Sequence, residues 1–127
     1  MKHIAIFRQP FFDMILRGSK TIESRWSLKK IAPYQKVKKG DVILLKQSGK
    51  MVTATAKVKD VKYFELTPSI ADYINEQWGK QIGIEYFDNW EAFRRKKYCT
   101  LIWLEEVKCV EPFEVKKSNG SGWLVVK

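Results

Sequence analysis

The sequence predicts an α+β fold in which a mostly antiparallel β-barrel has short helices closing one side. Most segments alternate apolar and polar residues with the period of a strand, and turns such as Ser48-Gly49-Lys50 separate them. Helical spacing is concentrated between residues 67 and 97. The length of 127 residues suits one domain, so we expect residues 1–127 to form a single domain.

The first predicted elements are a strand and a short helix. Residues 3–7 alternate weakly and predict a strand, and Arg8 follows where its side chain can overhang a cleft. Residues 10–17 predict a helix, because proline suits a first helical position and Gly18 suits the left-handed residue that ends a helix. His3 is interpreted as a bystander, since no catalytic triad can be built around it.

The next stretch, Gly18-Ser19-Lys20-Thr21-Ile22-Glu23-Ser24-Arg25, is the most informative in the chain. Residues 21–26 predict a strand whose period of two puts Glu23 and Arg25 on one face. On residue types alone, a solvated salt bridge on an edge strand is the favoured interpretation. The alternative is a cleft in which these charges and Lys20 meet a ligand, because burying them unpaired is costly.

A Lys-rich connection follows, from Ser27 to Lys39, with Tyr34 among its lysines. Basic side chains interleaved with an aromatic ring are typical of a groove for single-stranded nucleic acid. The interpretation that we favour here is a solvated loop whose tyrosine covers the edge of the core.

The middle of the chain predicts a hairpin and two helices. Residues 42–45 and 51–58 form the hairpin, whose second strand continues to Phe64. The first helix begins at Thr67-Pro68 and ends at Gly79. The second covers residues 90–97 and is capped by Asp88 or Asn89.

The C-terminal part returns to strands. Residues 98–107 are apolar on both faces at their centre, which predicts a central strand covered on both sides. A further strand begins at residues 112–115, residues 118–122 predict a flexible turn, and residues 123–126 predict the last strand.

Composition narrows the possible partners. The net charge is +10, and it is uneven: residues 1–62 hold 15 Lys and Arg against 4 Asp and Glu, and residues 63–127 hold 9 against 10. A basic half favours an anionic partner such as nucleic acid, with a soluble protein carrying Lys-rich hairpins as the equal alternative.

Several classes of protein are not expected. No apolar run reaches the roughly 18 residues of a membrane span, and no signal-peptide pattern is present, so we expect a cytoplasmic protein without membrane contact. Cys99 and Cys109 would lie about 30 Å apart on one strand, too far for a disulfide. Two cysteines and a single histidine are too few ligands for a zinc site, so we expect no metal site and no cofactor.

Four features carry a resemblance to a known family: the helix of residues 10–17, the Gly-x-Lys-Thr-x-Glu-x-Arg motif, Gly40-Asp41-Val42-Ile43, and the Ala-x-Ala-x-Val of residues 54–58. Over about residues 3–110 the chain resembles the ASCH domains of the PUA-like β-barrel superfamily. The resemblance implies a PUA-like barrel that binds RNA or modified bases in its cleft. The residues that we expect to bind nucleic acid carry charged or aromatic side chains: Arg8, Lys20, Glu23, Arg25, Tyr34, Lys36, Lys38 and Tyr98.

The resemblance also implies two enzymatic alternatives, for which Lys20, Glu23 and Arg25 are the catalytic candidates. Related acetylcytidine amidohydrolases carry a lysine, a nucleophilic threonine three residues later and a helical glutamate. Lys20 matches the lysine, but Glu23 occupies the nucleophile's position, and Glu76 matches the helical acid only loosely. A ribonuclease would need Lys20 desolvated as a base and Arg25 as a cation. A protein-interaction module is the third class of function, and RNA or nucleotide binding is the first.

Overall fold

The computed structural model of the chain describes residues 1–116 and 122–126. The strands are β1 (Lys2–Phe7), β2 (Ile22–Ser27), β3 (Val42–Gln47), β4 (Val52–Glu65), β5 (Tyr98–Phe113) and β6 (Trp123–Val126). The helices are α1 (Phe11–Arg17), α2 (Pro68–Ile82), the short 3₁₀ helix η1 (Ile84–Tyr86) and α3 (Trp90–Arg94). Strands and helices therefore occur where the sequence predicts them, and the boundaries that differ are described below.

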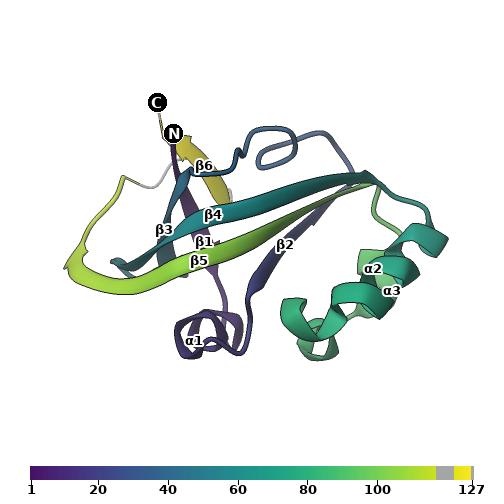
Figure 1. Cartoon of the computed structure of the whole chain (residues 1–127), viewed down its shortest axis with the longest axis horizontal. Coiled ribbons are helices and arrows are strands. Elements are labelled where there is room, and N and C mark those ends of the chain that lie inside the picture. The colour runs from purple at the N-terminus through teal and green to yellow at the C-terminus, as the bar shows by residue number, and fades with distance from the viewer. Residues whose placement is uncertain (117–121, 127) are drawn as a thin grey trace.

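In the described residues the strands form one six-stranded sheet in the order β2-β5-β4-β3-β1-β6. It curls into a half-barrel with α1 below it and α2 and α3 at one end (Figure 1). The prediction of a mostly antiparallel sheet is confirmed, since four of the five strand pairs among the described residues are antiparallel, but the sheet forms only a half-barrel. β1 pairs with β3 in parallel, so the sheet is mixed, because the chain crosses from one to the other through α1, β2 and the Lys-rich loop. β2 and β6 also remain as edges, so the barrel is not closed.

Two groups of buried side chains pack against the two faces of the sheet. The first fills the inside of the curl and includes Phe12, Leu45 and Ile102. The second lies between the sheet and α2 and includes Ile74 and Leu101. Because neighbouring residues of β5 belong to different groups, this strand is covered on both sides, as its sequence predicts.

The helix α2 does not end at Gly79, where the sequence predicts its end. It continues to Ile82, and Gly83 takes the left-handed conformation at φ 84°. A glycine inside a helix costs only about 1 kcal/mol, so the signal was weak. Thr67 is the N-cap, as predicted, and its side chain accepts a hydrogen bond from Ile70 N.

Three further boundaries concern the C-terminal half. α3 ends at Arg94 and is capped by Asn89, whose side chain accepts from Ala92 N. β5 runs through Pro112 to Phe113, so no separate strand begins there. The turn predicted at residues 118–122 falls mostly outside the described residues. No helix in the described part of the chain has the length and apolarity that crossing a membrane requires.

His3 is not a bystander but a buried structural residue. Its Nε2 atom lies 2.8 Å from Oδ2 of Asp41, and the indole of Trp123 donates to its Nδ1 at 3.1 Å. The Asp41 carboxylate also accepts from Lys38 N at 2.9 Å. These bonds join β1, β6 and the start of β3, which explains why a lone histidine is fully buried near the chain start.

Candidate functional site

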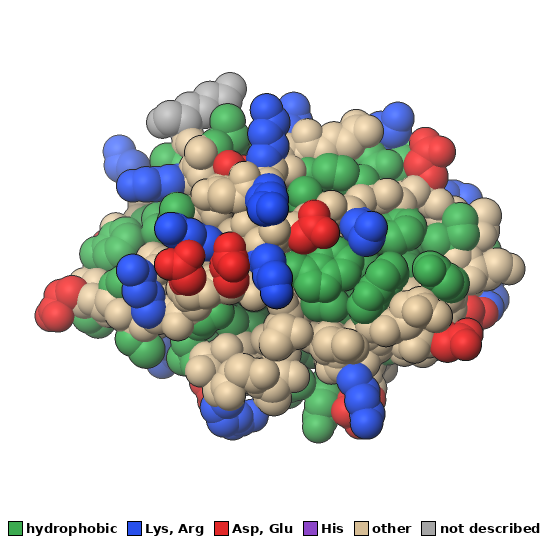
Figure 2. All heavy atoms as spheres, in the orientation of Figure 1, with side chains coloured by type: hydrophobic (Ala, Val, Ile, Leu, Met, Phe, Trp, Pro, Cys, Tyr) green, Lys and Arg blue, Asp and Glu red, His purple; other side chains and the backbone are tan. Residues whose placement is uncertain are grey.

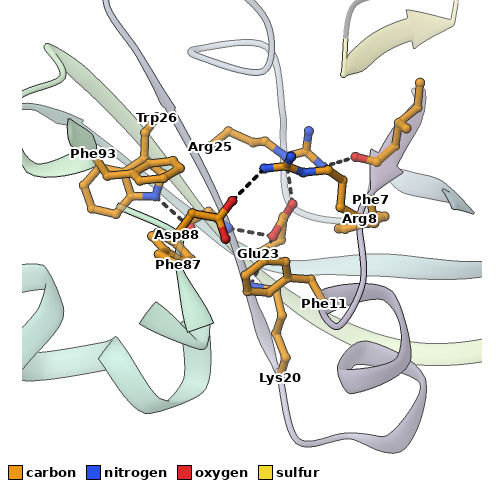
Figure 3. A pocket seen from close by; sticks show the side chains of 12 residues that line it. Phe7, Arg8, Phe11, Lys20, Glu23, Arg25, Trp26, Phe87, Asp88 and Phe93 are labelled. Carbon is orange, nitrogen blue, oxygen red and sulfur yellow. Dashed lines mark hydrogen bonds and ion pairs between the residues drawn. The ribbon is translucent and has the colours of Figure 1, made fainter. Parts of the chain in front are cut away.

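The motif lies at a pocket of about 230 Å³ beside the outer edge of β2. The end of β1, the start of α1, β2 and the segment from η1 to α3 surround it (Figure 3). The lining residues are Ile6, Phe7, Arg8, Phe11, Lys20, Glu23, Ser24, Arg25, Trp26, Phe87, Asp88 and Phe93. We call this the motif pocket. Four predicted site residues, Arg8, Lys20, Glu23 and Arg25, come together here.

Glu23 and Lys20 form a buried ion pair at the base of the motif pocket. Lys20 is 2% exposed and Glu23 is 6% exposed. Nζ of Lys20 donates to Oε1 of Glu23 at 3.2 Å, to Ile22 O at 2.9 Å and to Ile82 O, so all three of its N–H groups are engaged. The solvated salt bridge that the residue types favoured is therefore wrong, although β2 is an edge strand as predicted.

Arg25 connects the motif to the other side of the curled sheet. Its Nε donates to Oε2 of Glu23 at 2.7 Å, and its two terminal nitrogens donate to Ile6 O and Gly122 O, both at 3.0 Å. The guanidinium also lies over the rings of Phe7 and Trp123. Two of its five N–H donors thus bridge the gap between the open edge at β2 and the backbone of β1 and of the residue before β6, and a third holds Glu23.

The charges in this cluster set one another's protonation. Burial lowers the pKa of Lys20, and the Glu23 carboxylate opposes that effect only in part. Burial acts to raise the pKa of Glu23, but Arg25 and Lys20 outweigh it, so the pKa of this carboxyl lies below its ordinary value. Glu23 is therefore an ionised acceptor at neutral pH.

Aromatic rings form the walls of the pocket. Figure 3 shows Trp26, Phe87 and Phe93 gathered on one side, with Phe7 and Phe11 on the other. Trp26 makes edge contacts with Phe87 and Phe93, at centroid distances of 6.4 and 6.3 Å. Its indole N–H donates to Oγ of Ser24 at 2.8 Å, which fixes the ring beside the opening. Sequence reasoning missed this wall, because the rings come from segments 60 residues apart and share no local spacing.

The rim is nearly neutral, in contrast to the basic cleft that the sequence suggests. Arg8 lies at the rim as predicted, but it pairs with Asp88 at 3.5 Å, and both side chains are largely exposed. The lining holds three cations and two carboxylates, which leaves one positive charge in excess. On the face of the molecule that Figure 2 shows, basic side chains are likewise interspersed with acidic ones and form no single continuous patch.

The other predicted residues lie outside the motif pocket. Tyr34 is buried and packs against Tyr63 and Tyr98 at centroid distances of 5.4 and 4.9 Å, so its ring covers the core. Tyr34 and Tyr98 are therefore not at the rim. Lys36 and Lys38 are exposed in the loop before β3. A second hollow, lined by Arg25 and Trp26 together with Ile31 and Pro33, separates that loop from the motif pocket.

Neither Glu23 nor Thr21 is placed to serve as the nucleophile of the amidohydrolase alternative. Glu23 is engaged by both cations, and Thr21 is exposed and does not line the motif pocket. Glu76 lies at a different hollow on α2. Among the residues described, no three His, Cys, Asp or Glu side chains are grouped to hold a metal ion.

Comparison with known proteins gives a family and a fold. The sequence model of the ASCH domain matches residues 6–119. A comparison with curated proteins finds no match. The crystal structure of ASCH from Zymomonas mobilis has a TM-score of 0.71 at 12% identity, covering 99% of this chain and 87% of its own. A serine-to-alanine mutant of that protein gives a TM-score of 0.73 at 12% identity, with 99% and 88% covered. At these identities the solved structures show a shared fold.

Proposed function

The chain belongs to the ASCH domain family, and from that membership and the motif pocket we propose that it binds RNA or a nucleotide by holding one unpaired base between the aromatic walls. The observation that carries the proposal is the combination of Trp26, Phe87 and Phe93 with an ionised carboxylate, Glu23, in one recess. Single-stranded RNA is recognised in this way, by stacking on aromatic rings and hydrogen bonds to the base edge.

The size of the pocket supports a single base. Sites for drug-sized ligands usually measure about 300–1,000 Å³, and the motif pocket measures about 230 Å³. A duplex cannot present a base to such a recess without unstacking it. We therefore expect single-stranded RNA or a free nucleotide to bind in preference to double-stranded RNA.

The phosphate contacts that we propose come from the loop between β2 and β3 and not from Arg25. Three donors of Arg25 are committed to Glu23 and to the backbone, so a bidentate grip on a phosphate would require breaking them. The loop lysines, including Lys36 and Lys38, are exposed, and Ile31 and Pro33 of the same loop line the second hollow beside Trp26. A strand with its base in the motif pocket can run along this hollow toward them.

Fluorescence anisotropy with a labelled six-nucleotide single-stranded RNA tests the proposal. Replacing one wall ring, Phe93→Ala, should weaken binding about tenfold, because each base that stacks on an aromatic ring contributes about 1–3 kcal/mol. Tyr73→Ala is the matched control, since Tyr73 is an exposed ring on α2 outside the pocket. Loss of binding in both variants alike, or in neither, would contradict the proposal, provided that circular dichroism shows both folded.

A hydrolytic activity on RNA or a modified nucleoside is the second candidate, and the burial of Lys20 favours it. A desolvated lysine with a lowered pKa meets one requirement for a general base. All three of its N–H groups are engaged, however, so it must release a partner before it can accept a proton from substrate. Incubating RNA and acetylcytidine with the protein and analysing products by chromatography tests it: products formed by wild type and not by Lys20→Met would establish the activity.

A further inference from the structure

The outer edge of β2 carries backbone groups whose direction can be assigned. In the described residues β2 pairs only with β5. In an antiparallel pair the N–H and C=O of alternate residues face the partner, and those of the residues between face away. Thr21 O accepts from Leu104 N, so odd-numbered residues face β5. The backbone groups of Ile22, Ser24 and Trp26 therefore face the motif pocket side.

Two side-chain contacts agree with this assignment. Lys20 donates to Ile22 O at 2.9 Å, and Glu23 Oε1 accepts from Ser24 N at 3.0 Å. The motif thus covers the first part of the edge. The next two groups along it, the C=O of Ser24 and the N–H of Trp26, have no partner within residues 1–116 and 122–126. Both residues line the motif pocket.

The edge therefore presents three groups in a fixed order. The Glu23 carboxylate is an acceptor, the Ser24 C=O is a second acceptor, and the Trp26 N–H is a donor. Glu23 retains acceptor capacity, because its two oxygens accept three hydrogen bonds and a carboxylate offers about four lone-pair sites. Backbone polar groups of this kind require a partner, either water or a ligand.

A ligand with an amino group next to a ring nitrogen that accepts complements this order. We propose that this edge recognises the amino-bearing edge of cytosine or adenine: one amino hydrogen goes to Ser24 O, the other to Glu23, and the ring nitrogen accepts from the N–H of Trp26. This inference rests on the proposed function and names the class of base that the motif pocket takes.

Uracil is excluded by the same order of groups. It presents a ring N–H flanked by two carbonyl oxygens, with no amino group. If its N–H binds the Ser24 C=O, one carbonyl oxygen accepts from Trp26 and the other faces the Glu23 carboxylate, where two acceptors repel. Lys20 and Arg25 cannot relieve that repulsion by rotating toward the oxygen without breaking their bonds to the backbone and to Glu23.

The first arm of the test changes the ligand one atom at a time. Six-nucleotide RNAs of cytidine, adenosine and uridine are compared by anisotropy, and then cytidine hexamers in which one residue lacks the amino group (2-pyrimidinone) or has carbon in place of the ring nitrogen (3-deazacytidine). The cytidine and adenosine hexamers should bind roughly tenfold or more tightly than uridine. Each single-atom analogue should bind more weakly than cytidine.

The second arm removes the Trp26 N–H from the protein. Trp26→Pro lacks both the indole and the N–H, and Trp26→Ala lacks only the indole. Proline is tolerated on an edge strand where its nitrogen faces away from the sheet, as at this position. Relative to the alanine variant, the proline variant should lose a further several-fold in affinity for cytidine, but not for 3-deazacytidine, which has no ring nitrogen to accept the bond.

The outcomes separate this inference from the proposed function. Equal affinity for uridine, cytidine and adenosine hexamers, with Phe93→Ala still weakening all of them, would overturn the inference and leave the proposed function standing. Affinity that is unchanged by both single-atom analogues would overturn it equally. Absence of binding to every RNA would overturn the proposed function and the inference with it.

Discussion

The Nε atom of Arg25 lies 2.7 Å from Oε2 of Glu23, and from this ion pair the guanidinium continues to the backbone oxygens of Ile6 and Gly122. One side chain therefore joins the edge strand β2 to β1 and to the residue before β6. The motif has two roles in consequence: it fixes the base of the pocket, and it holds together the open side of the half-barrel.

The first prediction concerns the stability that this bridge provides. Arg25→Ala should lower the free energy of unfolding by about 3 kcal/mol, because it leaves the buried Glu23 with one partner fewer. Arg25→Lys should recover only part of this lost free energy of unfolding, since the ammonium of lysine cannot reproduce the planar, forked hydrogen bonding of a guanidinium. Urea denaturation measures both. Arg95→Ala is the control: Arg95 is 72% exposed and pairs with Glu91 on the surface, so its loss should cost less than about 1 kcal/mol.

The second prediction concerns acid. The pKa of Glu23 is lower in the folded chain than its ordinary value of 4.5. Its contribution to stability is therefore fully present above about pH 4.5 and is lost as the pH falls through the folded-state pKa. Glu23→Gln should be less stable at pH 7 and should lose less stability between about pH 5 and pH 2 than wild type does. Identical acid dependence in the two proteins would contradict the ion pairs described for Glu23.

The third prediction distinguishes two glycines at the end of α2. Gly79→Ala should raise the free energy of unfolding by about 0.5–1 kcal/mol, because the glycine is helical and the added Cβ meets only the exposed Asn75 side chain, which can rotate away. Gly83→Ala should lower it by about 1 kcal/mol or more, because φ is +84° and Met14 lies 3.2 Å from the added Cβ. The opposite order in thermal unfolding would place the helix end at Gly79.

The fourth prediction uses the two cysteines. Cys99 is fully buried between β2 and β4, and burial together with the nearby Glu23 raises the pKa of its thiol. Cys109 is exposed. A thiol reagent should modify one cysteine quickly and the second only as fast as the protein unfolds. Cys109→Ser should remove the fast phase; a fast phase that persists would show that Cys99 is accessible.

Much of the fold follows from local signals in the sequence. Gly18 takes the left-handed conformation at φ 80°, Thr67 caps α2, and β5 is covered on both faces, as predicted. These features depend on residues adjacent in the chain. The parallel pairing of β1 with β3 could not be predicted in this way, because it depends on which distant segments meet. Gly79 shows the same limit, since tertiary packing overrides a weak helix-ending signal.

The candidate site was predictable in part. The period of two correctly placed Glu23 and Arg25 on one face, but it could not show that Glu23 is buried and Arg25 partly buried. Tyr34 was counted among the cleft residues because it stands among lysines, but its ring packs on Tyr98, which confirms the favoured interpretation that it covers the edge of the core. The wall formed by Phe87 and Phe93 had no signal in the sequence, because tertiary packing alone brings these rings to β2.

The fifth prediction concerns salt. If about four phosphates meet the loop lysines, the logarithm of RNA affinity should fall with a slope near −3 against the logarithm of salt concentration. Lys36→Ala or Lys38→Ala should each reduce that slope by less than one unit. Lys50→Ala, an exposed lysine in the β3–β4 turn, should leave it unchanged. Equal effects from all three lysines would assign the salt dependence to net charge and not to the loop.

Backbone amide chemical shifts, followed while a cytidine hexamer is added, test most directly whether the motif pocket holds a base. The largest changes should fall on the amides of Trp26, Phe87 and Phe93 and on the Trp26 indole, because a stacked ring shifts the nuclei beside it. Smaller changes should follow in the loop between β2 and β3. RNA binding with changes confined to that loop or to α2, and none at the three aromatic residues, would contradict the account.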